Sequence, residues 1–253
     1  MARTLPHTSF NRSRLVRVLA GLAVTEVAEA KQSLAERLGL WLDFTDAMAL
    51  FSALGSRAGG TSASPLAGPA SGPLQAELVR LRSALVDAIT TDGVRKTGNV
   101  RIKLPTPAHN ASVEDAADFS PYHRYYLAHQ REMSASIAAL RASARAALAG
   151  HSPDLKRLAA LDEVLEQALA SRERNLLATV PLFVGKRFEQ LFAAHRAARR
   201  DTPLADAPEC WLQPGGWLVA FYRDMQAVLL AELEVRLEPV AGLIAALGKE
   251  VTK

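Results

Sequence analysis

Histidine is the residue type in this chain that is best suited to metal binding or acid–base chemistry, because its ordinary pKa lies near neutrality. The chain has six histidines. Two histidines on one helix must lie three or four residues apart to share a metal ion, and no pair here has that spacing. His129 and Glu132 do have it, but two ligands do not make a site. The sequence therefore predicts no metal site, and only a centre assembled from distant segments stays open.

Residues 120–132, with the sequence SPYHRYYLAHQRE, contain three of the four tyrosines and two of the histidines. Tyr122 and Tyr126 are one helical turn apart, so their rings lie on one face and could hold a ligand or a partner. Aromatic residues at helical spacing more often pack in a core. We take Tyr122, Tyr126 and His129 as candidate partner contacts, with core packing as the alternative.

Two sets of basic residues lie on predicted helix faces. The first set falls within an arc of about 100° with no acid on it and consists of Arg124, Arg131, Arg141 and Arg145. The second lies opposite Phe188 and Phe192 and consists of Lys186, Arg196 and Arg200. Such faces can follow a phosphate backbone, bind an anionic protein, or simply be solvated. No base-reading motif accompanies them, so sequence-specific recognition of nucleic acid is not predicted.

Catalytic motifs are missing from the sequence. It contains no G-x-x-x-x-G-K-[ST] phosphate loop, no G-x-G-x-x-G and no G-x-S-x-G nucleophile elbow. The acidic residues of the later helices are predicted to lie on outer helix faces: Asp162, Glu163, Glu166, Glu232, Glu234 and Glu238. We therefore expect that the chain is not an enzyme and needs no cofactor, unless a site forms from residues that are distant in the sequence.

The elements that must position these residues are predicted to be helices. Apolar residues recur at helical spacing over six ranges: 11–54, 74–90, 120–149, 152–179, 181–200 and 217–253. Met48 and Phe51, in the apolar second half of the first region, are expected to be buried. Pro239 is expected to kink the last helix. The one short strand candidate is Val100–Leu104. The predicted fold is all-α, an antiparallel bundle or pair of bundles of long helices.

A linker divides the predicted helices. Of the 19 residues from 55 to 73, 16 are Gly, Pro, Ser or Ala. Such a segment has too little apolar surface to offset the entropy of ordering, so it is predicted to be disordered. The predicted organisation is an N-terminal helical region over 9–54, the linker over 55–73 and a helical bundle over 74–253.

The composition is that of a globular protein, with 49% hydrophobic and 22% charged residues in 253. The single cysteine, Cys210, excludes an intrachain disulfide and favours a reducing compartment. No apolar run is long enough to predict a membrane span. The N-terminus has the outline of a signal peptide, but Arg17 interrupts its apolar stretch and an amphipathic helix is favoured. A cytoplasmic location is expected.

Several stretches carry a resemblance to a family: RSRLV at 12–16, LPTP at 104–107, DFSPYHRYYLAHQREM at 118–133, LAALD at 158–162 and LLATVP at 176–181. The chain resembles an uncharacterised family of proteobacterial helical proteins encoded near a MotA-like membrane protein and an OmpA-like protein. That pair is similar to the proton-driven motor of Zorya-type anti-phage systems. The resemblance implies a soluble accessory component of such a system, and it implies no enzymatic residues.

These observations predict a non-enzymatic helical adaptor that docks on a partner protein, with a membrane motor as the partner that the resemblance implies. The alternative is a nucleic-acid-binding protein without sequence specificity, which uses the arginine-rich faces. The net charge of +4 is uneven, with −4 over residues 201–253. That asymmetry leaves a homo-oligomer open. No membrane insertion is expected.

Overall fold

The computed structural model describes residues 13–22, 40–55, 71–91, 101–112, 115–199 and 208–251. Every regular element in these ranges is helical, which confirms the predicted all-α fold. The elements are α1 (Arg14–Gly21), α3 (Phe44–Gly55), α4 (Ser71–Thr90), the short 3-10 helix η2 (Asp115–Ala117), α5 (Ser120–Ala149), α6 (Pro153–Ala178), α7 (Val180–Arg199), α8 (Pro208–Trp211) and α9 (Trp217–Val251).

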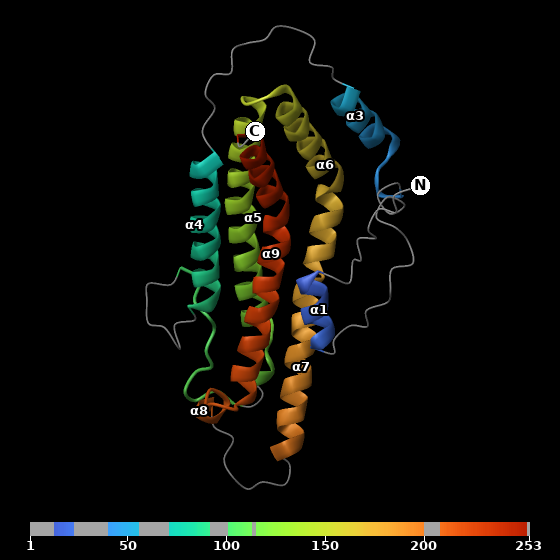
Figure 1. Cartoon of the computed structure of the whole chain (residues 1–253). Coiled ribbons are helices and arrows are strands. Elements are labelled where there is room, and N and C mark those ends of the chain that lie inside the picture. The colour runs from blue at the N-terminus through green and yellow to red at the C-terminus, as the bar shows by residue number, and fades with distance from the viewer. Residues whose placement is uncertain are drawn as a thin grey trace, which may run out of the picture.

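The long helix α9 is the centre of the bundle. Figure 1 shows α4, α5 and α9 side by side, with α6 and α7 following one another along the other flank. Helices α1, α4, α5 and α7 all pack against α9. Because α9 has neighbours on several sides, apolar residues around most of its circumference are buried. They include Leu218, Phe221, Met225, Val228, Leu229, Leu233, Leu237, Val240, Ile244 and Leu247.

The hairpin of α5 and α6 begins and ends where the sequence predicts. Pro121 lies in the first turn of α5, where a missing N–H leaves no helical hydrogen bond unmade. Gly150 caps the C-terminus of α5. Ser152 then caps α6, and its side chain accepts a hydrogen bond of 3.3 Å from the backbone N–H of Leu155. The tight connection makes α5 and α6 antiparallel neighbours.

Helices α6 and α7 are separated by Thr179 alone. Thr179 keeps a nearly helical backbone, with φ of −80° and ψ of −20°, so the chain continues in much the same direction (Figure 1). Pro181 lacks the N–H that would otherwise donate to the carbonyl oxygen of Leu177, four residues earlier. The proline therefore interrupts a long helix, and the Leu177 carbonyl accepts instead from a backbone N–H at the C-terminal cap of α6.

Two predictions about local structure are wrong. Residues 101–104 form a bend and irregular backbone with no strand pairing among the described residues, and Leu104 is buried in the helical core. Met48 and Phe51, which the sequence predicted to be buried, are exposed. The reason is that α3 packs mainly against one neighbour, α6, so its opposite side is left uncovered.

The division into regions stays a prediction. Helix α3 ends at Gly55 and α4 begins at Ser71, so helices extend into both ends of the predicted linker. Residues 56–70, the middle of that linker, lie outside the described residues. In the first predicted helical region, α1 contributes buried Leu15 and Leu19, whereas residues 23–39 lie outside the described part.

Candidate functional site

The three predicted partner contacts of α5 lie in the core. Tyr122, Tyr126 and His129 are all buried. The ring of Tyr122 packs 5.4 Å from that of Phe188 and 5.3 Å from that of Phe221, between centroids. A partner cannot reach these side chains in the folded protein. Their assignment as partner contacts is thus corrected to the alternative, in which aromatic residues at helical spacing anchor α5 in the bundle.

Glu232 of α9 is a fully buried acidic residue, with an exposed fraction of 0%. It accepts hydrogen bonds from the Tyr126 hydroxyl at 2.8 Å, from Gln130 Nε2 at 2.9 Å and from Arg236 Nη2 at 2.7 Å. We call Tyr126, Gln130, Glu232 and Arg236 the Glu232 cluster. A buried charge is tolerated only when it is paired and hydrogen-bonded, and this cluster meets both conditions.

The tyrosine of the Glu232 cluster stays a hydrogen-bond donor. Burial, and next the charge of Glu232, raise the pKa of Tyr126 well above its ordinary value. Both effects disfavour the phenolate, because it would be a second negative charge in the same buried place. The sequence placed Glu232 on an outer helix face, and the structure corrects that placement.

Gln130 connects the Glu232 cluster to the interruption between α6 and α7. Its Nε2 also donates to the carbonyl oxygen of Leu177, at 3.1 Å. This carbonyl loses its helical donor at Pro181 and accepts instead from a backbone N–H at the C-terminal cap of α6. The amide of Gln130 is a second donor to it, so both acceptor positions of a carbonyl in the core are used. The cluster therefore joins α5, α9 and the junction of α6 with α7.

His129 lies one residue before Gln130 and has a different environment. Its ring packs edge-on against Tyr125, with 4.5 Å between the centroids, and its Nε2 makes no hydrogen bond in the structure. Burial lowers the pKa of His129 from 6.5 to about 4. The imidazole is therefore neutral at physiological pH and acts as a flat, largely apolar ring.

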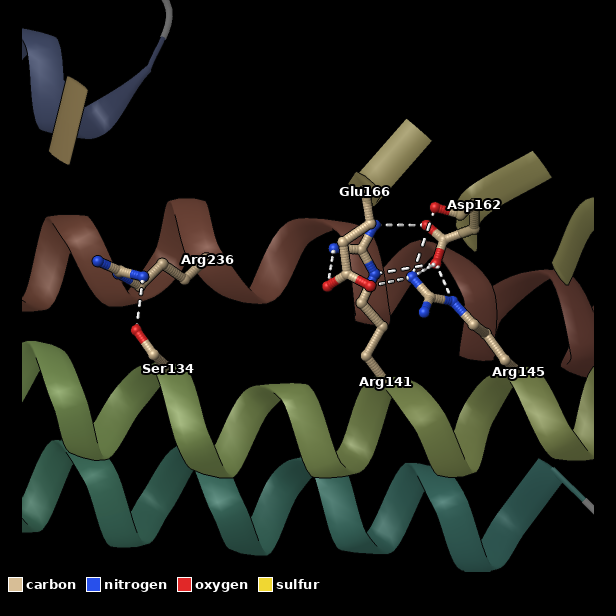
Figure 2. A network of polar contacts seen from close by, with 6 residues as sticks. All are labelled: Ser134, Arg141, Arg145, Asp162, Glu166 and Arg236. Atoms are coloured by element: carbon tan, nitrogen blue, oxygen red, sulfur yellow. Dashed lines mark hydrogen bonds and ion pairs between the residues drawn. The ribbon is translucent and has the colours of Figure 1, made fainter. Parts of the chain in front are cut away.

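Two of the predicted anion-binding arginines are held inside the protein. Figure 2 shows Arg141 and Arg145 of α5 reaching across to Asp162 and Glu166 of α6. Arg141 donates to Asp162 through Nε at 2.9 Å and Nη2 at 2.6 Å, and to Glu166 through Nη1 at 3.1 Å. Arg145 donates to Asp162 through Nε at 2.7 Å and to Glu166 through Nη2 at 2.5 Å. We call these four residues the interhelical ion-pair network.

Burial limits what this network can bind. The side chains of Arg141 and Arg145 are only 14% and 17% exposed. Burial alone would raise the pKa of Asp162, but hydrogen bonds from the two arginines and their charges outweigh it and hold that pKa below its ordinary value. The four charges compensate one another, so Arg141 and Arg145 do not offer the free cationic face that the sequence suggested.

Acidic residues of the C-terminal fifth of the chain also form ion pairs with other helices of the protein. Asp224 of α9 pairs with Arg187 of α7 at 2.9 Å, and Glu234 of α9 pairs with Arg14 of α1 and lies 3.8 Å from Arg82 of α4. Each of these basic residues comes from a helix that packs on α9. Part of the uneven charge along the sequence is therefore explained by acids of α9 that pair with basic residues of the neighbouring helices.

The remaining predicted basic residues are distributed over two helices. Arg124 and Arg131 of α5 and Lys186 and Arg196 of α7 are exposed, and none of them forms an ion pair within the described ranges. Lys186 lies over the ring of Phe183 and Arg196 over that of Phe192, at 5.7 and 6.0 Å. Arg200 lies outside the described residues.

The clearest surface feature was not predicted as a site. Helix α3 presents large apolar side chains on one side, with Phe44 82% and Phe51 71% exposed. Together with the residue that precedes the helix by four positions, they form what we call the α3 face: Leu40, Phe44, Met48, Phe51 and Leu54. Within α3 the spacing of four, three and three residues places Phe44, Met48, Phe51 and Leu54 on one side of the helix, and Leu40 lies just before α3, beyond the non-helical residues 42–43.

The opposite side of α3 is attached to the bundle. Trp41, Leu42, Leu50 and Ala53 are half-buried, and α6 is the neighbour that α3 contacts. The guanidinium of Arg172 on α6 lies 5.4 Å from the centre of the Trp41 ring. Helix α3 thus packs against α6 by one side (Figure 1), and the apolar side chains of the α3 face are exposed to solvent.

Other chemistry has little support within the described part of the chain. No group of three or more His, Cys, Asp or Glu side chains there could hold a metal ion. An open pocket of about 470 Å³ lies where the end of α7 meets the start of α9, and its lining includes His195, Arg199, Cys210 and Trp217. Among the described helices, none combines the length and apolar character needed to cross a membrane.

A sequence signal existed for one of the features that was missed. Glu232 follows Val228 by four residues and Leu229 by three, so it falls inside the apolar stripe of α9 rather than outside it. A carboxylate inside such a stripe points to a buried, paired charge. The signal for the α3 face was present as apolar residues, but exposure depends on how many helices surround α3, which periodicity does not reveal.

Comparison with known proteins gives one match. The sequence model of a family described as "Protein of unknown function (DUF3348)" matches residues 1–249. No match to a curated protein or to a solved structure was found.

Proposed function

The chain belongs to the DUF3348 family of unknown function, and we propose that it is a non-enzymatic adaptor that docks on a partner protein through the α3 face. The observation that carries this proposal is the exposure of four large apolar side chains on one side of α3, and of Leu40 just before it, while the other side of α3 packs against α6. Contiguous apolar patches of this size on a protein surface are often interaction sites.

The arrangement suits helix-in-groove or helix-on-helix recognition. Anchors at spacings of three and four residues are the pattern by which a helix docks its apolar side on a partner. The two aromatic anchors, Phe44 and Phe51, lie seven residues apart and bracket Met48, a side chain that adapts to irregular surfaces. Packing against α6 supports the helix before it docks, which lowers the entropy lost on binding.

The resemblance supports one partner above others. The resemblance implies that the chain is encoded beside a MotA-like membrane protein and an OmpA-like protein, a pair similar to the motor of Zorya-type anti-phage systems. In this proposal the chain is a cytoplasmic accessory component, and its partner is the cytoplasmic part of the MotA-like protein.

The experiment is co-expression of the full chain with the cytoplasmic part of the neighbouring MotA-like protein, followed by purification through a tag on that part. We expect the chain to co-purify. Phe51→Asp places a charge in the centre of the α3 face and should abolish co-purification. Because Phe51 is exposed, the variant should keep its helical circular dichroism and its melting temperature.

The matched control is Thr45→Asp, which adds the same charge to an exposed position of α3 outside the α3 face. It should co-purify as the wild type does. Loss of binding in both variants, or in neither, would contradict docking through this face.

A nucleic-acid-binding protein is the second candidate. Its support is that Arg124, Arg131, Lys186 and Arg196 are exposed and form no ion pair among the described residues. Its weakness is that Arg141 and Arg145 are neutralised by Asp162 and Glu166.

A further inference from the structure

We infer that, in the absence of its partner, the α3 face is covered by the α3 face of a second copy of the chain, so that the isolated protein is a two-fold symmetric dimer. The inference concerns the same surface as the proposed function and rests on it in one respect: the partner must displace the second copy. Dimerisation itself is argued from the face alone.

The area of the face is sufficient for a second copy. Five large side chains, each more than half exposed, offer roughly 500–600 Å² of apolar surface. Two such faces together bury about 1,000–1,200 Å², which approaches the lower end of specific protein interfaces. The face is therefore large enough for a reversible dimer and too small for an obligate one.

The chemistry of the face is self-complementary. Its five residues are all apolar, so two copies meet without burying an unpaired charge. The acids of α3, Asp43 and Asp46, lie beside the face and are already used as a reciprocal cap: the N–H of Asp46 donates to Asp43 at 2.7 Å, and the N–H of Asp43 donates to Asp46 at 3.2 Å. A symmetric dimer requires one patch to match itself, and an uncharged apolar patch does so.

The spacing of the face fits a helix pair. Within α3, Phe44, Met48 and Phe51 follow one another by four and three residues, an average of 3.5, which is the repeat that keeps an apolar seam in register between two helices. Met48 is the middle residue of these three. In a two-fold pair the middle of the seam lies near the symmetry axis, so Met48 faces Met48 of the second copy. Figure 1 shows α3 beside α6 at the edge of the bundle, and α6 is its main neighbour among the described helices, so the α3 face is not covered by another of them.

The test is sedimentation equilibrium of the purified full chain over a concentration series. We expect a monomer–dimer equilibrium in the wild type. Phe51→Asp should raise the dimer dissociation constant by roughly 100-fold or more, since truncating a central anchor has effects of that size. Thr45→Asp should leave the constant unchanged. A wild type that is monomeric at all concentrations, or a dimer that Phe51→Asp does not weaken, overturns the inference.

A second measurement tests the register. On a Cys210→Ser background, which removes the exposed native thiol, Met48→Cys should form a disulfide-linked dimer under mild oxidation. Thr45→Cys on the same background should cross-link much more slowly. Equal rates would contradict a seam centred on Met48.

The failures of the two proposals are distinguishable. If the wild type is monomeric but still co-purifies with the MotA-like protein in a Phe51-dependent way, the dimer fails and the adaptor stands. If the wild type dimerises through Phe51 while Phe51→Asp still co-purifies, the dimer stands and docking through the α3 face fails.

Discussion

At the scale of single residues, the core of this protein tolerates a charge because three different donors converge on it. Tyr126, Gln130 and Arg236 all donate to Glu232, and they come from two helices. Gln130 serves two acceptors, the Glu232 carboxylate and the Leu177 carbonyl. Removing that one amide would take one donor from each of two acceptors, although the Leu177 carbonyl would keep a backbone N–H and Glu232 would keep Tyr126 and Arg236.

His129 makes the stability of the protein depend on pH. Its pKa is about 4 in the folded protein and near 6.5 when the chain is unfolded. Below pH 6.5 the unfolded state therefore binds the proton more readily, and the stability contributed by the neutral ring is lost as the pH falls towards 4. We expect this group alone to lower the free energy of unfolding by about 2 kcal/mol between pH 7.5 and 5.

The measurement is urea unfolding at both pH values in the wild type and in His129→Leu, which cannot bind the proton. The difference between the two pH values should shrink by most of that amount in the variant. His123→Leu, on the same helix, is the control and should keep the wild-type pH dependence. An unchanged dependence in His129→Leu would show that another group is responsible.

Residue-scale predictability was uneven for a physical reason. Periodicity places a side chain on one side of its own helix, and it identified Tyr122 and Tyr126 as sharing a face. It does not say which side the next helix covers. Tyr126 and Glu232 are 106 positions apart, and their contact depends on how α5 and α9 pack. The burial of Tyr126 and Glu232 therefore follows only from the three-dimensional packing of the two helices.

At the scale of elements, the boundaries of the long helices were the most predictable feature. Ser152 and Pro153 at the start of α6, and Gly150 at the end of α5, act within a few residues of chain. The one predicted strand was wrong because alternation over residues 100–104 is a weak local signal, and no described strand is present to pair with it. Local signals predict where helices begin and end, but not which helices lack a neighbour, as α3 demonstrates.

The interhelical ion-pair network should hold α5 and α6 together measurably. Arg141→Ala leaves Asp162 and Glu166, both partly buried, with half of their cationic partners. We expect a loss of about 1–3 kcal/mol in the free energy of unfolding. Urea unfolding provides the value. Arg131→Ala on the exposed side of the same helix should change it by no more than about 0.5 kcal/mol.

A double-mutant cycle separates pairing from simple truncation. If the network acts as a unit, Arg141→Ala combined with Asp162→Ala should destabilise less than the sum of the two single changes. Strict additivity would mean that the ion pairs contribute nothing beyond side-chain packing.

At the scale of the whole molecule, the net charge of +4 overstates the cationic surface available to a ligand. Arg141, Arg145, Arg187 and Arg236 all pair with carboxylates inside the bundle. We therefore expect binding of a short DNA duplex to be weak, in the range of about 10⁻⁴–10⁻⁶ M at physiological salt, and to disappear on further addition of salt.

Fluorescence anisotropy at two salt concentrations measures that binding. The informative variant is the combination of Arg124→Ala with Arg131→Ala, because both residues are exposed and neither forms an ion pair among the described residues. Tight binding by the wild type that this variant weakens would favour the nucleic-acid alternative over the adaptor.

The central place of α9 also has a consequence for synthesis. Helices α1, α4, α5 and α7 all precede α9 in the chain, yet each of them packs against it. Until residues 217–251 have been made, those earlier helices lack the neighbour that buries much of their apolar surface, and contacts among α4, α5, α6 and α7 cover only part of it. Domains usually begin to fold from their N-terminal parts as they emerge, but this core cannot be completed before α9 is present. We therefore expect chaperones that shield apolar surface to bind the nascent chain until α9 has been made.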